Sequence, residues 1–252
     1  SMSERLRGPL FFLILAGAGL LPADDWPQWR GPERDGVWRE TGIVEKLPGK
    51  LTYLWRTPVG MGYAGPAVAA GRVYLMDRVL GDGEANPDNP FNKKRVSGRE
   101  RILCFDAAGG KLLWKHSYAS NYAISYPYGP RTTPTVSGGK VYCLGAMGDL
   151  LCLDAGGGKV LWSKQCVRDF DAELNTWGYS SSPLVDGKKL IVLVGGKPGA
   201  CIVAFDKDSG KELWRALEDT DPGYASPVIF NAGGTRQLII WTPTKLASLN
   251  PE

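Results

Sequence analysis

The chain has 252 residues, a length that fits one large domain or two ordinary ones. Its 33 Gly, 18 Pro and 9 Trp favour many short strands joined by turns over long helices. The formal net charge of +4 is small and Lys and Arg form no dense stripe, so nucleic-acid binding is not expected.

Residues 1–23 have the pattern of a signal peptide. Arg5 and Arg7 precede the apolar run Leu10–Leu21, and a small-residue cleavage position follows at Ala23. This run is shorter than the ~20 apolar residues that a membrane-spanning helix needs. We therefore expect an exported protein, periplasmic or extracellular, with no stable membrane span after cleavage. An uncleaved anchor is the alternative; no Cys follows the run, so a lipid-modified N-terminus is not indicated.

Residues 24–50 form a Trp-rich lead-in segment without a clear periodicity. Pro and Gly interrupt it repeatedly, which is typical of loops. We expect an ordered loop that Trp26, Trp29 and Trp38 pin to a scaffold. The alternative is that these three Trp form a ligand-binding aromatic cluster.

A repeat occupies residues 51–252. Its core is an apolar strand, an Asp, a Gly-Lys turn and a second strand ending in Trp, as in Ile102–Trp114, Leu151–Trp162 and Ile202–Trp214. The last two intervals between these Trp residues are 48 and 52 residues. Two further strands precede each core, and four strands per ~45–50 residues indicate a propeller blade. In the first repeat we expect strands at 71–77 and 102–106 around an insertion at 79–100.

The repeated residues predict how blades stack. The Trp supplies a large plate between neighbouring blades and an N–H for a backbone carbonyl, and the Asp can accept from turn amides. The docking Asp residues are Asp106, Asp154 and Asp206. The docking Trp residues are Trp55, Trp114, Trp162 and Trp214.

The motif Asp-x-x-x-Gly-Lys-x-x-Trp resembles the tryptophan-docking repeat of the PQQ-like (quinoprotein-type) β-propeller family. This resemblance implies an all-β fold, a propeller of four-stranded antiparallel blades, with about four blades in this chain. The strand Leu51–Arg56 could complete the last blade and close a four-bladed ring. We favour the alternative that the resemblance implies, in which the chain continues and contributes to a larger ring of seven or eight blades.

The candidate binding residues come just before the innermost strand of each blade, where they would line one mouth of the central channel. They are Tyr63, Tyr128, Arg131, Trp177, Tyr179 and Tyr224. A ring of aromatic side chains with one Arg suits a planar or anionic ligand by stacking and charge. The alternative is that each Gly-Tyr pair is simply the turn and plug of a blade entry.

The five Cys residues offer little catalytic chemistry. We expect small buried side chains on strands, with a Cys143–Cys152 cross-strand disulfide as the alternative in an oxidising compartment. A hairpin centred on residues 147–148 would pair these two positions. There is no CxxC motif and only one His, so no metal site is expected.

The resemblance also allows an enzyme. Quinoproteins of this type hold the quinone between a Trp and a vicinal disulfide, beside a Ca²⁺ ion; this sequence has no vicinal Cys pair. We therefore expect no cofactor, and prefer an exported binding scaffold whose channel mouth or rim takes a protein, glycan or small-molecule ligand. In this respect the chain resembles outer-membrane assembly-scaffold propellers, without their lipid-anchor Cys. The alternative is a PQQ- and Ca²⁺-dependent dehydrogenase of alcohols or sugars.

Overall fold

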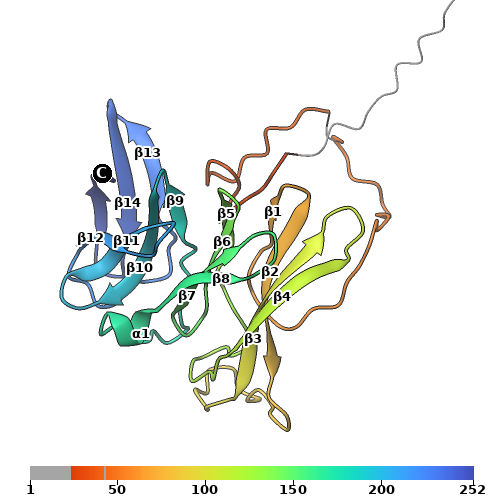
Figure 1. Cartoon of the computed structure of the whole chain (residues 1–252), viewed down its shortest axis with the longest axis horizontal. Helices are drawn as coiled ribbons and strands as arrows, with labels where there is room; N and C mark the ends of the chain where they lie inside the picture. Colours follow the sequence, from red (N-terminus) through yellow and green to blue (C-terminus); the bar gives the residue numbers. More distant parts are fainter. Residues whose placement is uncertain (1–23, 43) are drawn as a thin grey trace, which may run out of the picture.

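The structure is a computed structural model that describes residues 24–42 and 44–252 (Figure 1). The predicted signal peptide lies outside the described residues. Four antiparallel sheets account for nearly all of the regular structure, three with four strands and one with three. The first sheet contains β1 (Ala67–Ala69), β2 (Arg72–Leu80), β3 (Gly98–Asp106) and β4 (Leu112–Ala119). The second contains β5 (Thr135–Ser137), β6 (Lys140–Leu144), β7 (Asp149–Asp154) and β8 (Val160–Gln165).

The remaining elements continue the same order. The third sheet contains β9 (Leu184–Asp186), β10 (Lys189–Gly196), β11 (Ala200–Asp206) and β12 (Glu212–Ala216). The last contains β13 (Val228–Ala232), β14 (Thr235–Trp241) and β15 (Leu246–Leu249). The one helix of the described residues, α1 (Cys166–Asp169), is a single turn that the sequence analysis did not predict.

The sheets are blades packed face to face (Figure 1). Each has its first strand innermost, and β5 contacts both β1 and β9. Three apolar clusters fill the spaces between consecutive sheets, because one face of a sheet cannot be buried without a neighbour. The predicted all-β propeller architecture is confirmed.

The first blade has longer strands than predicted. Strands β2 and β3 pair from Arg72↔Asp106 to Leu80↔Gly98, so the loop between them is 81–97 rather than 79–100. Sequence patterning missed these ends because they carry charged side chains, which are normally signs of a loop. Asp77, Arg78 and Glu100 are instead buried in the sheet.

The register of the second blade separates two Cys residues. Cys143 pairs with Leu151 and Cys152 with Tyr142, so the predicted pairing of Cys143 with Cys152 is wrong by one residue. The cause is a three-residue turn in which Gly148 has φ +92° and donates to Gly145 O at 3.0 Å. A one-residue shift puts the two side chains on opposite faces. All five Cys are buried and free, as the preferred interpretation expected.

Residues 51–56 are not a strand and do not complete the last sheet, so the four-bladed closure is not observed. Trp55 still docks on the first blade, where its Nε1 donates to Ala107 O at 2.8 Å. A Cβ at Gly110 would lie 2.5 Å from the Trp55 ring.

The later repeats use the same docking geometry. Trp114 Nε1 donates to Ala155 O at 3.0 Å, and Trp162 Nε1 donates to Lys207 O at 3.0 Å. The Asp of each turn caps its amides: Asp154 accepts from Gly157 N at 2.6 Å. Trp214 Nε1 is buried and has no hydrogen-bond partner among the described residues.

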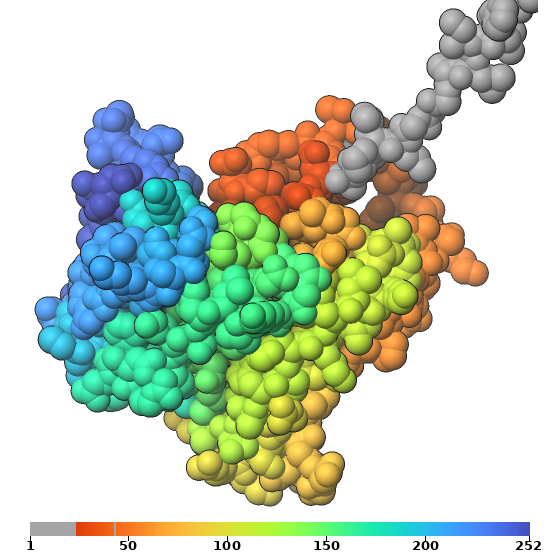
Figure 2. All heavy atoms as spheres, viewed as in Figure 1, coloured from red at the N-terminus to blue at the C-terminus, as the bar shows by residue number. Residues whose placement is uncertain are grey.

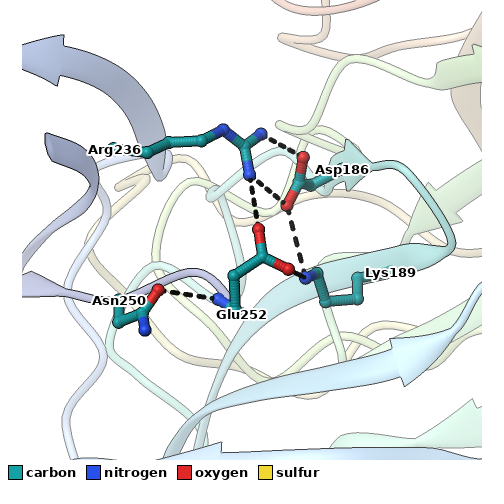
Figure 3. Close-up of polar contacts among 5 residues, drawn as sticks. All are labelled: Asp186, Lys189, Arg236, Asn250 and Glu252. Atoms are coloured by element: carbon teal, nitrogen blue, oxygen red, sulfur yellow. Dashed lines mark hydrogen bonds and ion pairs between the residues drawn. The ribbon is translucent and has the colours of Figure 1, made fainter.

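In each of the first three blades, a cation at the start of the second strand reaches across to the next blade. Arg72 donates to Ala155 O and Gly156 O at 2.9 Å, and Lys140 contacts Asp208 at 2.8 Å. Lys189 contacts Glu252 at 2.9 Å (Figure 3).

Arg236 adds to this last contact by bonding Asp186 and Glu252 (Figure 3). Both Arg236 and Glu252 are largely exposed, and such pairs stabilise by at most about 1 kcal/mol each. Among the described residues, no helix is both long and apolar enough to cross a bilayer.

Candidate functional site

The loops that connect successive blades meet on one end of the propeller. We call this end the mouth face and define it by residues 57–66, 120–134, 170–183 and 217–227, with the β2–β3 loop 81–97. The loops bond one another through their backbones: Tyr63 N donates to Pro130 O and Ser125 N to Thr176 O, both at 2.8 Å. Tyr126 N donates to Pro90 O at 2.6 Å. The mouth face is therefore held by a network and is not a set of independent loops.

Three predicted residues come together on this face. The rings of Tyr63 and Tyr128 meet edge to face with centroids 6.4 Å apart, and the Arg131 guanidinium lies 5.2 Å from the centre of the Tyr63 ring. Tyr63 is 49% exposed. This cluster presents an aromatic surface to solvent, as the sequence predicts for a mouth, and its ligand-binding role stays a prediction.

Arg131 also stabilises its own loop, a role that the sequence did not predict. Its guanidinium donates to the carbonyls of Gly129, Ser125 and Tyr126. Burial lowers its pKa from the ordinary value. Because these three bonds use both terminal nitrogens, Arg131 shapes its own loop; the carbonyls are neutral, so its positive charge is not compensated by them.

The second aromatic pair is Trp177 with Tyr224. Their ring centroids are 5.4 Å apart, and Ser180 Oγ donates to Tyr224 O at 3.3 Å. Trp177 is 43% exposed and Tyr224 is 36% exposed. The two residues belong to different interblade loops, so this pair joins the third and fourth blades at the surface.

Tyr179 does not share this surface. Its side chain is 5% exposed and lies among the apolar residues between the second and third blades, where its hydroxyl donates to Val194 O at 2.8 Å. The predicted mouth position is correct for its backbone, which donates to Ala146 O, but its ring turns inward to fill the space above Gly148.

The lead-in lies along the inner edges of the innermost strands. Trp26 pairs with Val68 of β1 through bonds of 2.8 and 2.9 Å, and Val136 N of β5 donates to Pro27 O at 2.8 Å. Figure 2 shows this red-orange segment packed over the orange and green strands. The lead-in is thus ordered and pinned to the scaffold.

Arg34 attaches the lead-in to the third blade. It is only 4% exposed and donates to Pro183 O at 2.9 Å and Ser182 O at 3.0 Å, just before β9. Burial lowers its pKa to about 9. Sequence reasoning assigned the pinning to Trp residues; Trp38, in contrast, is 58% exposed.

A cavity of about 460 Å³, which we call the channel cavity, lies between the lead-in and the mouth face. Its walls include Trp26 and Trp29 from the lead-in and Tyr63, Arg131 and Thr133 from the blades. This volume is in the range of small-ligand pockets. The two interpretations of the lead-in, a pinned loop and an aromatic ligand site, are therefore compatible, because Trp26 and Trp29 belong to the ordered lead-in and also line the cavity.

A buried polar cluster fixes the mouth end of the first blade to the second. Glu100 accepts hydrogen bonds from the hydroxyls of Tyr118 and Tyr122 and from Ala146 N at 3.0 Å. Arg78 lies 4.0 Å from the centre of the Tyr122 ring and donates to Pro127 O and Val96 O at 2.9 Å.

The protonation of this cluster follows from burial. Burial and then the charge of Glu100 raise the pKa of Tyr118 and Tyr122 well above the usual range, so both hydroxyls keep the protons they donate. Together these bonds satisfy the Glu100 carboxylate in a site with no access to water.

The described residues do not fit the quinone site that the resemblance implies. Their Cys residues are buried on separate elements, and no two are adjacent in the chain. Within residues 24–42 and 44–252, no group of three His, Cys, Asp or Glu side chains is arranged to hold a metal ion.

The fold is shared with a solved quinohemoprotein. Quinohemoprotein alcohol dehydrogenase from Comamonas testosteroni is 18% identical, with a TM-score of 0.55 over 90% of this chain and 39% of its own length. BamB from Moraxella catarrhalis is also 18% identical, with a TM-score of 0.45 over 76% of this chain and 62% of its own. A europium-containing methanol dehydrogenase is 17% identical, with a TM-score of 0.41 over 66% and 26%. The chain thus spans between about a quarter and three fifths of these proteins.

Sequence comparison gives the family. No curated protein sequence matches the chain. A family model described as "Outer membrane protein assembly factor BamB" matches residues 98–252, more than half of the chain. The chain therefore belongs to this family of PQQ-like propeller repeats.

Proposed function

We propose that this chain is the propeller of an exported binding scaffold and that it binds a protein partner through the mouth face. The observation that carries the proposal is the exposed aromatic surface formed there by Tyr63, Trp177 and Tyr224. Trp, Tyr and Arg are the residues in which the binding energy of protein interfaces is concentrated. Here they sit on loops held by rigid blades, so little conformational entropy is lost on binding.

The family supports both parts of the proposal. Its description, an outer membrane protein assembly factor, names a role in the assembly of other proteins. The predicted signal peptide supports export to the same region of the cell. A glycan or small ligand in the channel cavity is the competing use of this face, and the proposed scaffold role requires no cofactor.

Site-specific photocrosslinking in the native host tests the proposal. A photoreactive amino acid is placed in the full-length protein at Trp177 or Tyr224, and as matched controls at Leu161 or Leu213. Both Leu are exposed to a similar degree but lie on outermost strands. We expect one discrete protein adduct from the first pair and none from the second. Adducts from the outer strands alone would overturn the proposal.

The dehydrogenase alternative requires a separate experiment. The full-length protein is mixed with PQQ and Ca²⁺, and absorbance, melting temperature and dye reduction with alcohols are followed. Stoichiometric PQQ binding with alcohol-dependent dye reduction would replace the scaffold proposal. An unchanged melting temperature and absence of turnover would remove the enzyme alternative.

A further inference from the structure

A larger cavity, of about 610 Å³, lies between the lead-in and β1. It shares Trp26 and Val68 with the channel cavity but is otherwise lined by residues outside the mouth face. Its apolar lining consists of Trp26, Pro27, Pro32, Val37, Trp38 and Val68. We call it the lead-in cavity. Its size is that of a small-ligand pocket.

The backbone of the lead-in builds the walls of this cavity in advance. Asp24 N donates to Glu40 Oε1 at 2.6 Å, which joins the start of the lead-in to a residue 16 positions later. Gly31 lies under the Trp26 ring with φ +82°, and a Cβ there would be 2.9 Å from the ring. The backbone of Trp26 is also paired with Val68, so the indole projects from a fixed backbone position and packs against Gly31.

The rim of the cavity is acidic although the chain as a whole carries a net charge of +4. Its carboxylates are Asp24, Asp25, Glu33 and Glu40. Arg39 is the single basic side chain of the lining, and its guanidinium is bonded to Asp35. Cleavage at the predicted position after Ala23 would add the α-ammonium group of Asp24, which lies against Glu40, and the lining would still carry more carboxylates than cations. That bond lowers the pKa of Asp35 to about 2.

Glu33 is a free carboxylate of the rim. It is exposed and has no hydrogen bond or ion pair among the described residues. Asp25, in contrast, accepts from Ala70 N at 3.0 Å. The rim therefore keeps uncompensated negative charge beside an apolar floor.

The aromatic part of the lining is open to solvent. Trp38 is 58% exposed and Val37 is 48% exposed. An indole face attracts a cation through its quadrupole, and carboxylates nearby add to that attraction. An anion would meet repulsion from the rim, and a neutral apolar molecule would leave the carboxylates without a partner.

We propose that the lead-in cavity binds an organic cation, an ammonium or guanidinium group on an apolar body. The cavity volume, the exposed indole of Trp38 and the unpaired Glu33 select this chemistry together. The site is separate from the mouth face and does not depend on the function proposed for that face.

Pairs of small ligands that differ only in charge test the site. The probes are choline against its neutral isostere 3,3-dimethylbutan-1-ol, and N-acetylarginine amide against N-acetylcitrulline amide. Binding is followed by fluorine NMR of the full-length protein labelled with 5-fluorotryptophan, with the Trp38 resonance assigned through Trp38→Phe. We expect a saturable shift of the Trp38 resonance. Each cation that binds should do so about tenfold more tightly than its neutral partner.

Variants then locate the charge. Glu33→Gln should weaken binding of the cation several-fold, whereas Asp82→Asn, an exposed carboxylate of the β2–β3 loop, should not change it. The Trp177 resonance should not move. The stronger of the two cation classes identifies an amine or an arginine side chain as the source. Equal binding of charged and neutral partners, or an affinity unaffected by Glu33→Gln, would overturn the proposal.

Discussion

The two ends of the blades are built in different ways. At the end with the Gly-Lys turns, the contact between the first and second blades and the contact between the second and third blades repeat the same parts: a Trp ring over a Gly, its N–H on a carbonyl, and a cation crossing to the next blade. At the mouth end the contacts do not repeat. Glu100 of the first blade accepts from Tyr118 of the same blade and from Ala146 N of the second blade, which makes a charged, hydrogen-bonded contact between the two blades.

The corresponding positions of the second blade are apolar. Counting from the repeated Asp and Trp, Glu100 corresponds to Gly148 and Tyr118 to Cys166. There Tyr179 fills the space with its ring. This difference indicates that the end with the Gly-Lys turns stabilises the scaffold, whereas the residues at the mouth end can differ from blade to blade. The candidate binding residues lie at the end that diverges.

Removal of the buried carboxylate should have the largest effect. Glu100→Ala leaves Tyr118, Tyr122 and Ala146 N without their acceptor, so we expect a loss of about 3–5 kcal/mol in the free energy of unfolding. Urea denaturation measures it.

Two controls accompany this measurement. Cys166→Ala, at the apolar counterpart of Tyr118, should cost about 1 kcal/mol. The double variant R78M/E100L should lose less than the sum of its single changes, because it removes both buried charges. Equal losses at Glu100 and Cys166 would contradict the described difference between the two contacts.

The repeated end should be sensitive to a single methyl group. Gly158 has φ +74° and lies directly under the Trp114 ring, so Gly158→Ala should cost about 2–4 kcal/mol from backbone strain and overlap. Gly157→Ala is the matched control: its Cβ would meet only Asp154, at 3.5 Å. If the two Ala variants melt at the same temperature, the Trp-on-Gly contact does not have the role described.

The docking hydrogen bond itself should have a smaller effect. Trp162→Phe removes an N–H bonded to Lys207 O, whereas Trp214→Phe removes an N–H without a partner among the described residues. We expect the first change to cost about 1 kcal/mol more than the second, the usual net value of one hydrogen bond. Chemical denaturation of both variants provides the comparison; the reverse order would count against it.

The smallest expected effect is a dependence on pH. Burial first, and then Glu100, raise the pKa of Asp149 to about 6. The folded state then binds more protons than the unfolded state between about pH 4 and pH 6, so stability falls as pH rises through this window.

Asp149→Asn should remove that fall. We expect its melting temperature to exceed that of the parent protein by about 2–4 °C at pH 7, the shift that ~1 kcal/mol produces in a domain of this size. At pH 4 the two melting temperatures should agree. A parent protein whose stability rises from pH 4 to pH 6 would show that another group dominates.

Sequence reasoning predicted the repeated parts well because their chemistry is local. The Asp, Gly-Lys and Trp of each core are within a few residues of one another, so spacing alone identifies the turn and strands. Sequence reasoning failed where contacts between residues far apart in the sequence determine the structure. Arg78 and Glu100 looked like loop residues, and only the neighbouring blade explains their burial.

The candidate site shows the same limit. The candidate residues were chosen by their position before each innermost strand; Tyr63, Tyr128 and Arg131 lie together in the structure, but this position gives no sign that the Tyr179 ring turns inward. The sequence also showed no sign that Arg34 attaches the lead-in to the third blade, because its partners are the backbone carbonyls of residues 182 and 183. A carbonyl acceptor has no sequence signal, since every residue carries one.

The central claim is that the diverging mouth end, rather than the repeated end, is the functional surface. The most direct test is the affinity of the partner captured by crosslinking for two double variants, each confirmed as folded by circular dichroism. We expect W177A/Y224A to bind at least about 100-fold more weakly than the parent protein, a loss typical of interface hot spots. L161A/L213A should bind within about threefold, as outer-strand residues away from the interface do. Equal affinities of the two variants would contradict the account.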